Sequence, residues 1–108
     1  MIVTEDQMHA AVAVINDADG TAEVHFQATM AENYAKETFA KIFLSYTGAV
    51  EERKARATCN PETMEAKALE AEALRSLERR KAELRSAELI VEIWRTENAN
   101  ARAVERIR

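Results

Sequence analysis

The fold is decided by residues 60–108, which read NPETMEAKALEAEALRSLERRKAELRSAELIVEIWRTENANARAVERIR. The stretch contains no Gly and, after Pro61, no further Pro. Asn60 can accept a hydrogen bond from a free first-turn N–H, and Pro61 suits the first helical position, where its missing N–H costs nothing. Periodic runs well beyond about 25 residues are typical of a coiled coil, a membrane span or a helical repeat. Because the charge density excludes a membrane span, the sequence predicts one long helix over about 61–107.

Apolar residues repeat along this predicted helix at alternating steps of three and four residues. The series consists of Ala73, Leu77, Leu84, Ala87, Val91, Trp94 and Ala101, with Arg80 and Asn98 at its two polar steps. Such spacing is the heptad seam of a coiled coil with polar interruptions.

Further apolar side chains widen this face from residue 87 onward. They are Leu89, Ile90, Ile93, Val104 and Ile107. A single partner helix would not cover so broad a face, so the C-terminal third is predicted to be the centre of a helical bundle. We therefore expect a homo-oligomer. The residues expected at its interface are Leu84, Val91, Ile93, Trp94 and Ile107.

Composition supports an all-α fold within a single domain, residues 1–108. The chain has only 2 Gly and 1 Pro, with 47% hydrophobic and 31% charged residues, which is the composition of long helices. The single Cys59 cannot form an internal disulfide, and no apolar stretch reaches the roughly 18 residues of a membrane span. The N-terminus carries no signal-peptide pattern, so a cytoplasmic location without a membrane partner is expected.

The first half of the chain also shows helix signals. Thr4 and Gln7 are spaced as a capping box that starts a helix at Glu5. A seam of apolar residues follows, interrupted at Asp19: Met8, Val12, Ile15, Ala22, Phe26 and Met30. The patch at 16–21 contains Gly20, which predicts either a turn or a weak point within one helix. We favour one helix over about 5–46, with a break at Gly20 as the alternative.

A connector separates the two long helical segments. Gly48 supplies a helix stop, and residues 49–58 are predicted to form a short helix. Residues 1–46 carry seven acidic residues against two lysines, a balance of −5, whereas residues 75–108 carry nine basic residues against six acidic ones, a balance of +3. Matched lengths and opposite charge together predict a long antiparallel helical hairpin, or coiled coil, that assembles into an oligomeric bundle.

Residues suited to catalysis or metal binding are sparse. His9 and His25 lie too far apart for a ligand pair and lack a neighbouring Cys or His, and Cys59 has no paired base. We expect no enzyme activity, no catalytic residue, no cofactor, no metal and no small-molecule substrate.

Basic residues offer the main alternative to a purely structural role. Matching opposite charges three or four residues apart leaves Arg80, Arg102 and Arg106 without an obvious helix partner, so these three are the candidate phosphate contacts. Trp94 could stack on a nucleic-acid base, but its position on the seam favours a core role.

The order of sequence features over residues 30–108 also bears on the function. A Tyr-rich helix and a Gly connector are followed by Glu52-Arg53-Lys54-Ala55-Arg56-Ala57, an Ala/Glu helix over 66–77, and residues 79–87 leading into Ile93-Trp94-Arg95. In layout and composition the chain resembles the small helical proteins that tailed phages carry near their recombination genes, and more distantly the UvsY-like recombination mediators.

This resemblance implies an oligomeric, DNA-binding accessory protein of DNA recombination. It would assist a recombinase or annealing protein on single-stranded DNA, in the host cell cytoplasm if the chain is phage-encoded. The alternative function is that of a structural or adaptor protein that assembles through coiled coils and binds no nucleic acid.

Overall fold

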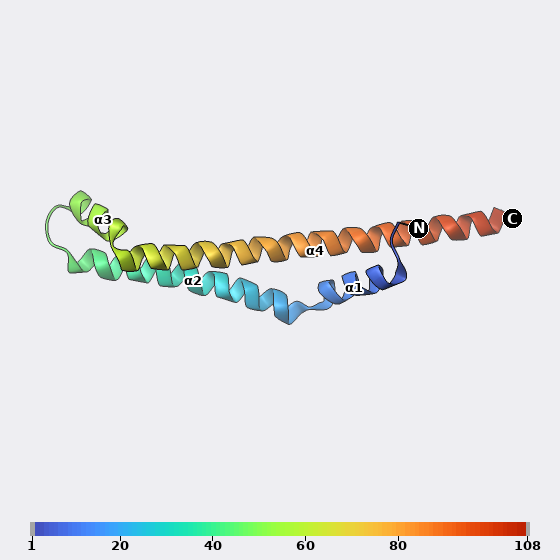
Figure 1. Ribbon diagram of the computed structural model, residues 1–108, viewed down its shortest axis with the longest axis horizontal. Coiled ribbons are helices and arrows are strands. Elements are labelled where there is room, and N and C mark those ends of the chain that lie inside the picture. Colours follow the sequence, from blue (N-terminus) through green and yellow to red (C-terminus); the bar gives the residue numbers. More distant parts are fainter. Residues whose placement is uncertain (1, 108) are drawn as a thin grey trace. The chain divides into compact units, whose positions relative to one another are not determined.

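A computed structural model describes residues 2–107 and shows an all-α fold (Figure 1). The described residues form four helices and no strand: α1 (Glu5–Asn16), α2 (Ala18–Ser45), α3 (Val50–Cys59) and α4 (Pro61–Ile107). The all-α class and the long helix expected over about 61–107 are thus confirmed. Among these described helices, none combines the length and the hydropathy that crossing a bilayer requires.

Local hydrogen bonds explain where the helices begin. At α1, Thr4 Oγ1 accepts from the Gln7 amide at 3.1 Å, and Gln7 Oε1 accepts from the Thr4 amide at 2.9 Å, which completes the predicted capping box. At α4, Asn60 Oδ1 accepts from the Glu62 amide at 2.9 Å, directly before Pro61. Both predicted helix starts are confirmed.

The prediction of one helix over 5–46 is wrong, because the chain breaks at Asp17. Here α1 ends at Asn16 and α2 starts at Ala18, whereas Gly20 lies inside α2. Asp17 leaves the helical conformation (φ −79°, ψ 68°), and its Oδ1 accepts from the Gly20 amide at 3.0 Å. An Asp that binds the third amide of the following helix is a typical N-cap. The break therefore depends on the carboxylate of Asp17 rather than on the flexibility of Gly20.

The described chain divides into two compact units, both of which contain part of α4. Unit 1 comprises residues 1–21 and 79–108, and unit 2 comprises residues 22–78. Whether the chain acts as a single domain stays a prediction. Each unit contains one antiparallel helix pair, so the predicted hairpin arrangement is found within both.

In unit 1, α1 runs antiparallel to the C-terminal part of α4. The Ile2 amide donates to Glu97 Oε1 at 2.8 Å at one end of the pair, and Arg80 contacts Asp17 at the other. Ala11, Ala87 and Val91 form the core, with exposed fractions of 4%, 4% and 8%. Val12, Val14 and Ile90 pack against this core. The core is small, so polar contacts at the two ends also position α1.

In unit 2, mostly small side chains line the buried face between α2 and α4. Ala28, Ala35, Thr38 and Ile42 are buried on α2, and Thr63 and Ala66 are buried on α4. Interaxial distance depends on the side chains at the contact, so alanines allow the two helices to pack closely.

The predicted seam of the first helix is wrong within α2. Phe26 and Met30 were expected to be buried, yet they are 56% and 51% exposed. The buried series instead passes through Ala28, two residues further along, which is roughly 200° around a helix of 3.6 residues per turn. The break at Asp17 resets the helical register, so the apolar spacing of α1 does not continue along the same face.

The connector between α2 and α3 follows the prediction closely. Gly48 has a φ of 116°, which favours glycine, and it lies in the turn between the end of α2 at Ser45 and the start of α3. The Arg53 guanidinium lies 4.2 Å from the centroid of the Phe43 ring and also donates to the Phe43 carbonyl at 3.4 Å. These contacts within unit 2 attach α3 to the end of α2.

The predicted seam of α4 is confirmed over most of its length. Its members from Ala73 to Asn98 are buried or half-buried, including the polar residue Arg80, whereas Ala101 is exposed. The same spacing extends backward through Glu70, Ala66 and Thr63.

Candidate functional site

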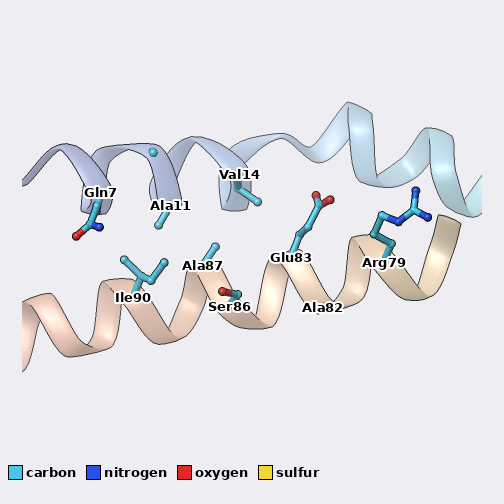
Figure 2. A pocket seen from close by; sticks show the side chains of 10 residues that line it. Gln7, Ala11, Val14, Arg79, Ala82, Glu83, Ser86, Ala87 and Ile90 are labelled. Carbon is cyan, nitrogen blue, oxygen red and sulfur yellow. The ribbon is translucent and has the colours of Figure 1, made fainter. Parts of the chain in front are cut away.

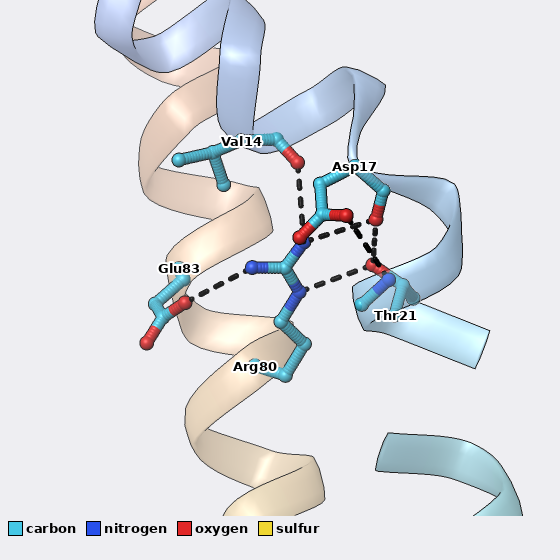
Figure 3. A network of polar contacts seen from close by, with 6 residues as sticks. Val14, Asp17, Thr21, Arg80 and Glu83 are labelled. Atoms are coloured by element: carbon cyan, nitrogen blue, oxygen red, sulfur yellow. Dashed lines mark hydrogen bonds and ion pairs between the residues drawn. The ribbon is translucent and has the colours of Figure 1, made fainter. Parts of the chain in front are cut away.

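The first candidate site is a polar junction around Arg80, at the end of α1 (Figure 3). The Arg80 side chain is only 13% exposed. Its Nη2 donates to the carbonyl oxygens of Val14 and Asp17, both at 3.2 Å, and contacts Asp17 Oδ2 at 3.4 Å. Its Nε donates to Thr21 Oγ1 at 3.0 Å, and its Nη1 donates to Glu83 Oε2 at 3.3 Å. All of these residues belong to unit 1.

This junction has a clear physical origin. The last carbonyls of a helix lack intrahelical donors, and here the Arg80 guanidinium supplies donors to the end of α1. A guanidinium can serve several acceptors at once because its five N–H donors are arranged in a fixed plane. The assumption that Arg80 lacks a partner is therefore wrong, and its donors are already engaged by unit 1.

The two remaining phosphate candidates lie near the end of α4. Arg102 and Arg106 are both exposed. The Nε of Arg102 donates to the Asn98 carbonyl of its own helix at 3.4 Å. The structure therefore leaves these two guanidinium groups accessible, in contrast to that of Arg80.

The five expected interface residues fall into three groups. Val91 is covered by α1 within the unit 1 core, so the structure does not present it to a partner. Leu84, Ile93 and Trp94 are half-buried, and the side-chain Nδ2 of Asn98 donates to the Trp94 carbonyl at 3.0 Å. Ile107 is 86% exposed. Assembly through Val91 would require displacement of α1, which corrects its place in the predicted interface.

A groove runs along one side of the α1–α4 pair of unit 1 (Figure 2). Its volume is about 570 Å³, and small or apolar side chains such as Ala11, Val14, Ala87 and Ile90 line it. Gln7, Arg79, Glu83 and Ser86 are its polar members. Figure 2 shows the side chains of Ala11 and Ala87 pointing into the space between the two helices.

A second hollow of about 320 Å³ lies on α4 nearer its C-terminus. Its lining combines apolar and acidic side chains: Ile2, Leu89, Glu92, Ile93, Thr96 and Glu97. Leu89 is 56% exposed and Ile2 is 83% exposed. This hollow therefore offers an apolar floor bordered by two carboxylates.

The hollow belongs to a second periodic series on α4, which we name the outer stripe. The outer stripe consists of Leu89, Ile93, Thr96, Asn100, Ala103 and Ile107. Its steps alternate between four and three residues, like those of the buried seam, but its members are exposed or half-buried. The sequence had indicated a widened apolar face here, and the heptad spacing of Thr96, Asn100 and Ala103 was the signal that could have identified a second seam.

Unit 2 also exposes large apolar side chains. Phe26, Met30 and Tyr34 are four residues apart on α2 and are 56%, 51% and 54% exposed. Side chains four apart lie on one face of a helix. These three residues therefore form a contiguous apolar stripe.

Groups suited to metal binding do not gather in the described part of the chain. Within residues 2–107, no three His, Cys, Asp or Glu side chains lie close enough together to hold an ion. Cys59 is an exposed free thiol. The absence of enzyme activity stays a prediction.

The fold and its exposed stripes place the chain among all-α proteins built on antiparallel helix pairs. No family model, curated protein or solved structure matches the chain. The resemblance to phage recombination accessory proteins and UvsY-like mediators thus stays a prediction.

Proposed function

We propose that the chain is a coiled-coil assembly protein that acts by associating with further copies of itself. The supporting observation is that large apolar side chains remain exposed on α4, both beside its covered seam and beyond the end of that seam. Leu89, Val104 and Ile107 on α4 are 56%, 50% and 86% exposed. Single exposed apolar residues are ordinary, but contiguous ones are typical of interaction surfaces.

Self-assembly would bury these side chains at a gain of about 25 cal/mol per Å² of apolar surface. A homo-oligomer also fits the expectation of a bundle centred on the C-terminal third. This proposal assigns the protein a structural or adaptor role, and a cytoplasmic location stays part of the proposal.

The mass of the protein in solution tests this function. Light scattering at micromolar concentration should give a multiple of the 12.1 kDa chain mass. Ile93→Asp should lower that mass toward the monomer, because burial of an unpaired carboxylate is strongly disfavoured. Ala71→Asp is the matched control, since it adds the same charge at an exposed position of α4 in unit 2. A monomeric mass for the unaltered protein would refute the assembly function.

A second candidate function is that of a recombination accessory protein on single-stranded DNA. The observation that favours it is the exposure of Arg102 and Arg106, which leaves both side chains accessible to phosphates. Binding to phosphates releases counterions, so the affinity should fall steeply with salt.

Replacement of both arginines tests the DNA function. Arg102→Ala with Arg106→Ala should weaken binding to single-stranded DNA and reduce the salt slope by up to about one unit per lost contact. Helicity measured by circular dichroism should remain unchanged. No detectable binding by the intact protein at low salt would exclude the accessory function.

A further inference from the structure

We propose that the outer stripe binds the outer stripe of a second copy, antiparallel, with residue 98 of each chain at the centre of the contact. This inference rests on the proposed assembly function and specifies the partner and the register. Along the stripe, residues whose numbers add to 196 then face each other, and the positions that flank the stripe pair with sums of 198 on one side and 194 on the other. Leu89 meets Ile107 of the second copy, Ile93 meets Ala103, and Thr96 meets Asn100.

The spacing of the outer stripe makes this pairing geometrically possible. Alternating steps of four and three residues keep one face of a helix toward a partner, as in a coiled coil. The stripe from Leu89 to Ile107 is about 27 Å long at 1.5 Å per residue. The exposed Ile107 would cover the acidic hollow near Leu89, where Ile93 and Thr96 also line the surface.

Flanking charges select this register. On one side of the stripe, Glu92 faces Arg106 of the second copy, and by symmetry the pair occurs twice. Both side chains are exposed, and Glu92 borders the hollow. On the other side, Ile90 faces Val104, so two apolar residues meet next to the stripe.

One of the neighbouring registers and the parallel arrangement are less favourable because they bring like charges together. A shift of one heptad in one direction places Arg85 opposite Arg106. A parallel dimer in register places Glu92 opposite Glu97 of the second copy. Like charges at such positions are destabilising. In the proposed register the Glu97 side chains of the two copies face each other. Each carboxylate, however, already accepts a hydrogen bond from the Ile2 amide of its own chain at 2.8 Å.

Polar residues within the stripe support the same register independently. Asn100 and Thr96 face each other only when the sum of residue numbers is 196. Their amide and hydroxyl groups can then form a hydrogen bond across the interface. The one-heptad shift described above instead places Asn100 against Leu89, which leaves a polar group unpaired. A polar residue in a coiled-coil core often specifies register in this way.

A charge exchange tests the pairing of Glu92 with Arg106. Glu92→Arg and Arg106→Glu should each raise the dimer dissociation constant about tenfold, because each turns two attractive pairs into repulsive ones. The double variant E92R/R106E should return the constant to within about threefold of the original value, since it restores two opposite-charge pairs. Sedimentation equilibrium measures all three constants.

Glu72→Arg and Arg75→Glu are matched controls for these charge changes. Glu72 and Arg75 form an exposed ion pair at 3.2 Å on α4 in unit 2. Neither control should change the dissociation constant by more than about twofold, in line with the small contribution of exposed ion pairs. A merely destabilising effect at residues 92 and 106, or loss of a phosphate contact by Arg106, would not be reversed in the double variant.

A distance measurement tests the antiparallel direction. Arg85 is exposed and lies outside the overlap. Spin labels at Arg85→Cys in a Cys59→Ser background should be about 39 Å apart in the proposed dimer, given 1.5 Å of rise per residue on each side of residue 98. A parallel dimer would bring them within about 10 to 15 Å, because paired helix axes lie 8–10 Å apart.

The outcomes separate this inference from the assembly function. A dimer with no rescue by charge exchange, or with the short label distance, would refute the register and leave self-assembly standing. A monomeric mass at every concentration would refute the assembly function and the inference with it. Rescue together with the long distance would support both.

Discussion

Unit 1 and unit 2 pair a helix with α4 by different physical means. In unit 2, Ala28, Ala35 and Ala66 are 5%, 0% and 1% exposed, so alanines provide the contact. In unit 1, the charged Arg80 occupies a position of the same α4 seam and is 13% exposed. Close packing holds the helix pair of unit 2, whereas hydrogen bonds at the end of α1 supplement a small core in unit 1. The same heptad spacing of α4 thus accommodates both kinds of contact, alanine packing and guanidinium hydrogen bonds, depending on the size and polarity of the side chain.

The largest effect is expected from loss of the Arg80 guanidinium, which should destabilise unit 1 and leave unit 2 unchanged. Arg80→Ala removes the donors to the Val14 and Asp17 carbonyls, so we expect unit 1 to be destabilised by about 3 kcal/mol. Hydrogen exchange should show early loss of protection at residues 5–16, while residues 28–42 keep theirs. Arg79→Ala, at an exposed neighbouring position, controls for the change in helix propensity. Equal effects of the two variants would mean that the junction does not stabilise unit 1.

Enlargement of a buried alanine should give the next largest effect, this time in unit 2. Ala35→Leu adds three carbon atoms where the wild-type side chain is fully buried, so we expect destabilisation by about 2 kcal/mol through overpacking. Ala40→Leu makes the same change at an exposed position of α2 and should have little effect. Urea denaturation compares the two variants. An unchanged free energy of unfolding in Ala35→Leu would contradict the close packing of alanines as the contact that stabilises unit 2.

The smallest predicted effect concerns Gly20 and the helix break in unit 1. Gly→Ala within a helix usually stabilises it by about 1 kcal/mol. A Cβ at Gly20, however, would overlap the carboxylate of Asp17, and displacement of that side chain would remove the cap worth about 1 kcal/mol. We therefore expect Gly20→Ala to be near neutral in the wild type but stabilising in an Asp17→Ala background. A thermal double-mutant cycle measures this difference. Identical effects in both backgrounds would show that the two residues are not coupled.

Periodicity and capping predicted α4 and the start of α1 correctly because they depend on neighbours in the sequence. The Thr4–Gln7 box, the Asn60-Pro61 start and the seam through Leu77, Leu84 and Ala87 are all local patterns. Each follows from helix geometry without knowledge of the partner helix. The predictable part of the fold is thus the part set within one helix.

The errors arose where tertiary contacts decide between alternatives. One continuous helix was expected, with a break at Gly20 as the alternative, but the cap formed by Asp17 places the break three residues before Gly20. Large side chains were expected to face inward, yet alanines permit a closer approach and leave Phe26 exposed. Similarly, Arg80 was considered unpaired because, apart from Glu83, its acceptors come from residues 14–21, far away in the sequence. Neither sequence spacing nor charge matching within α4 could have identified those partners.

The continuity of α4 also limits how the length of this chain can change. Each helical residue contributes about 100° of rotation, so deletion of a single residue within α4 would turn every later side chain away from its present direction. Only steps of about seven residues preserve the seam. The segment between α2 and α3 does not carry this restriction, because it does not continue a helix. Insertions and deletions should therefore be tolerated there and selected against within α4.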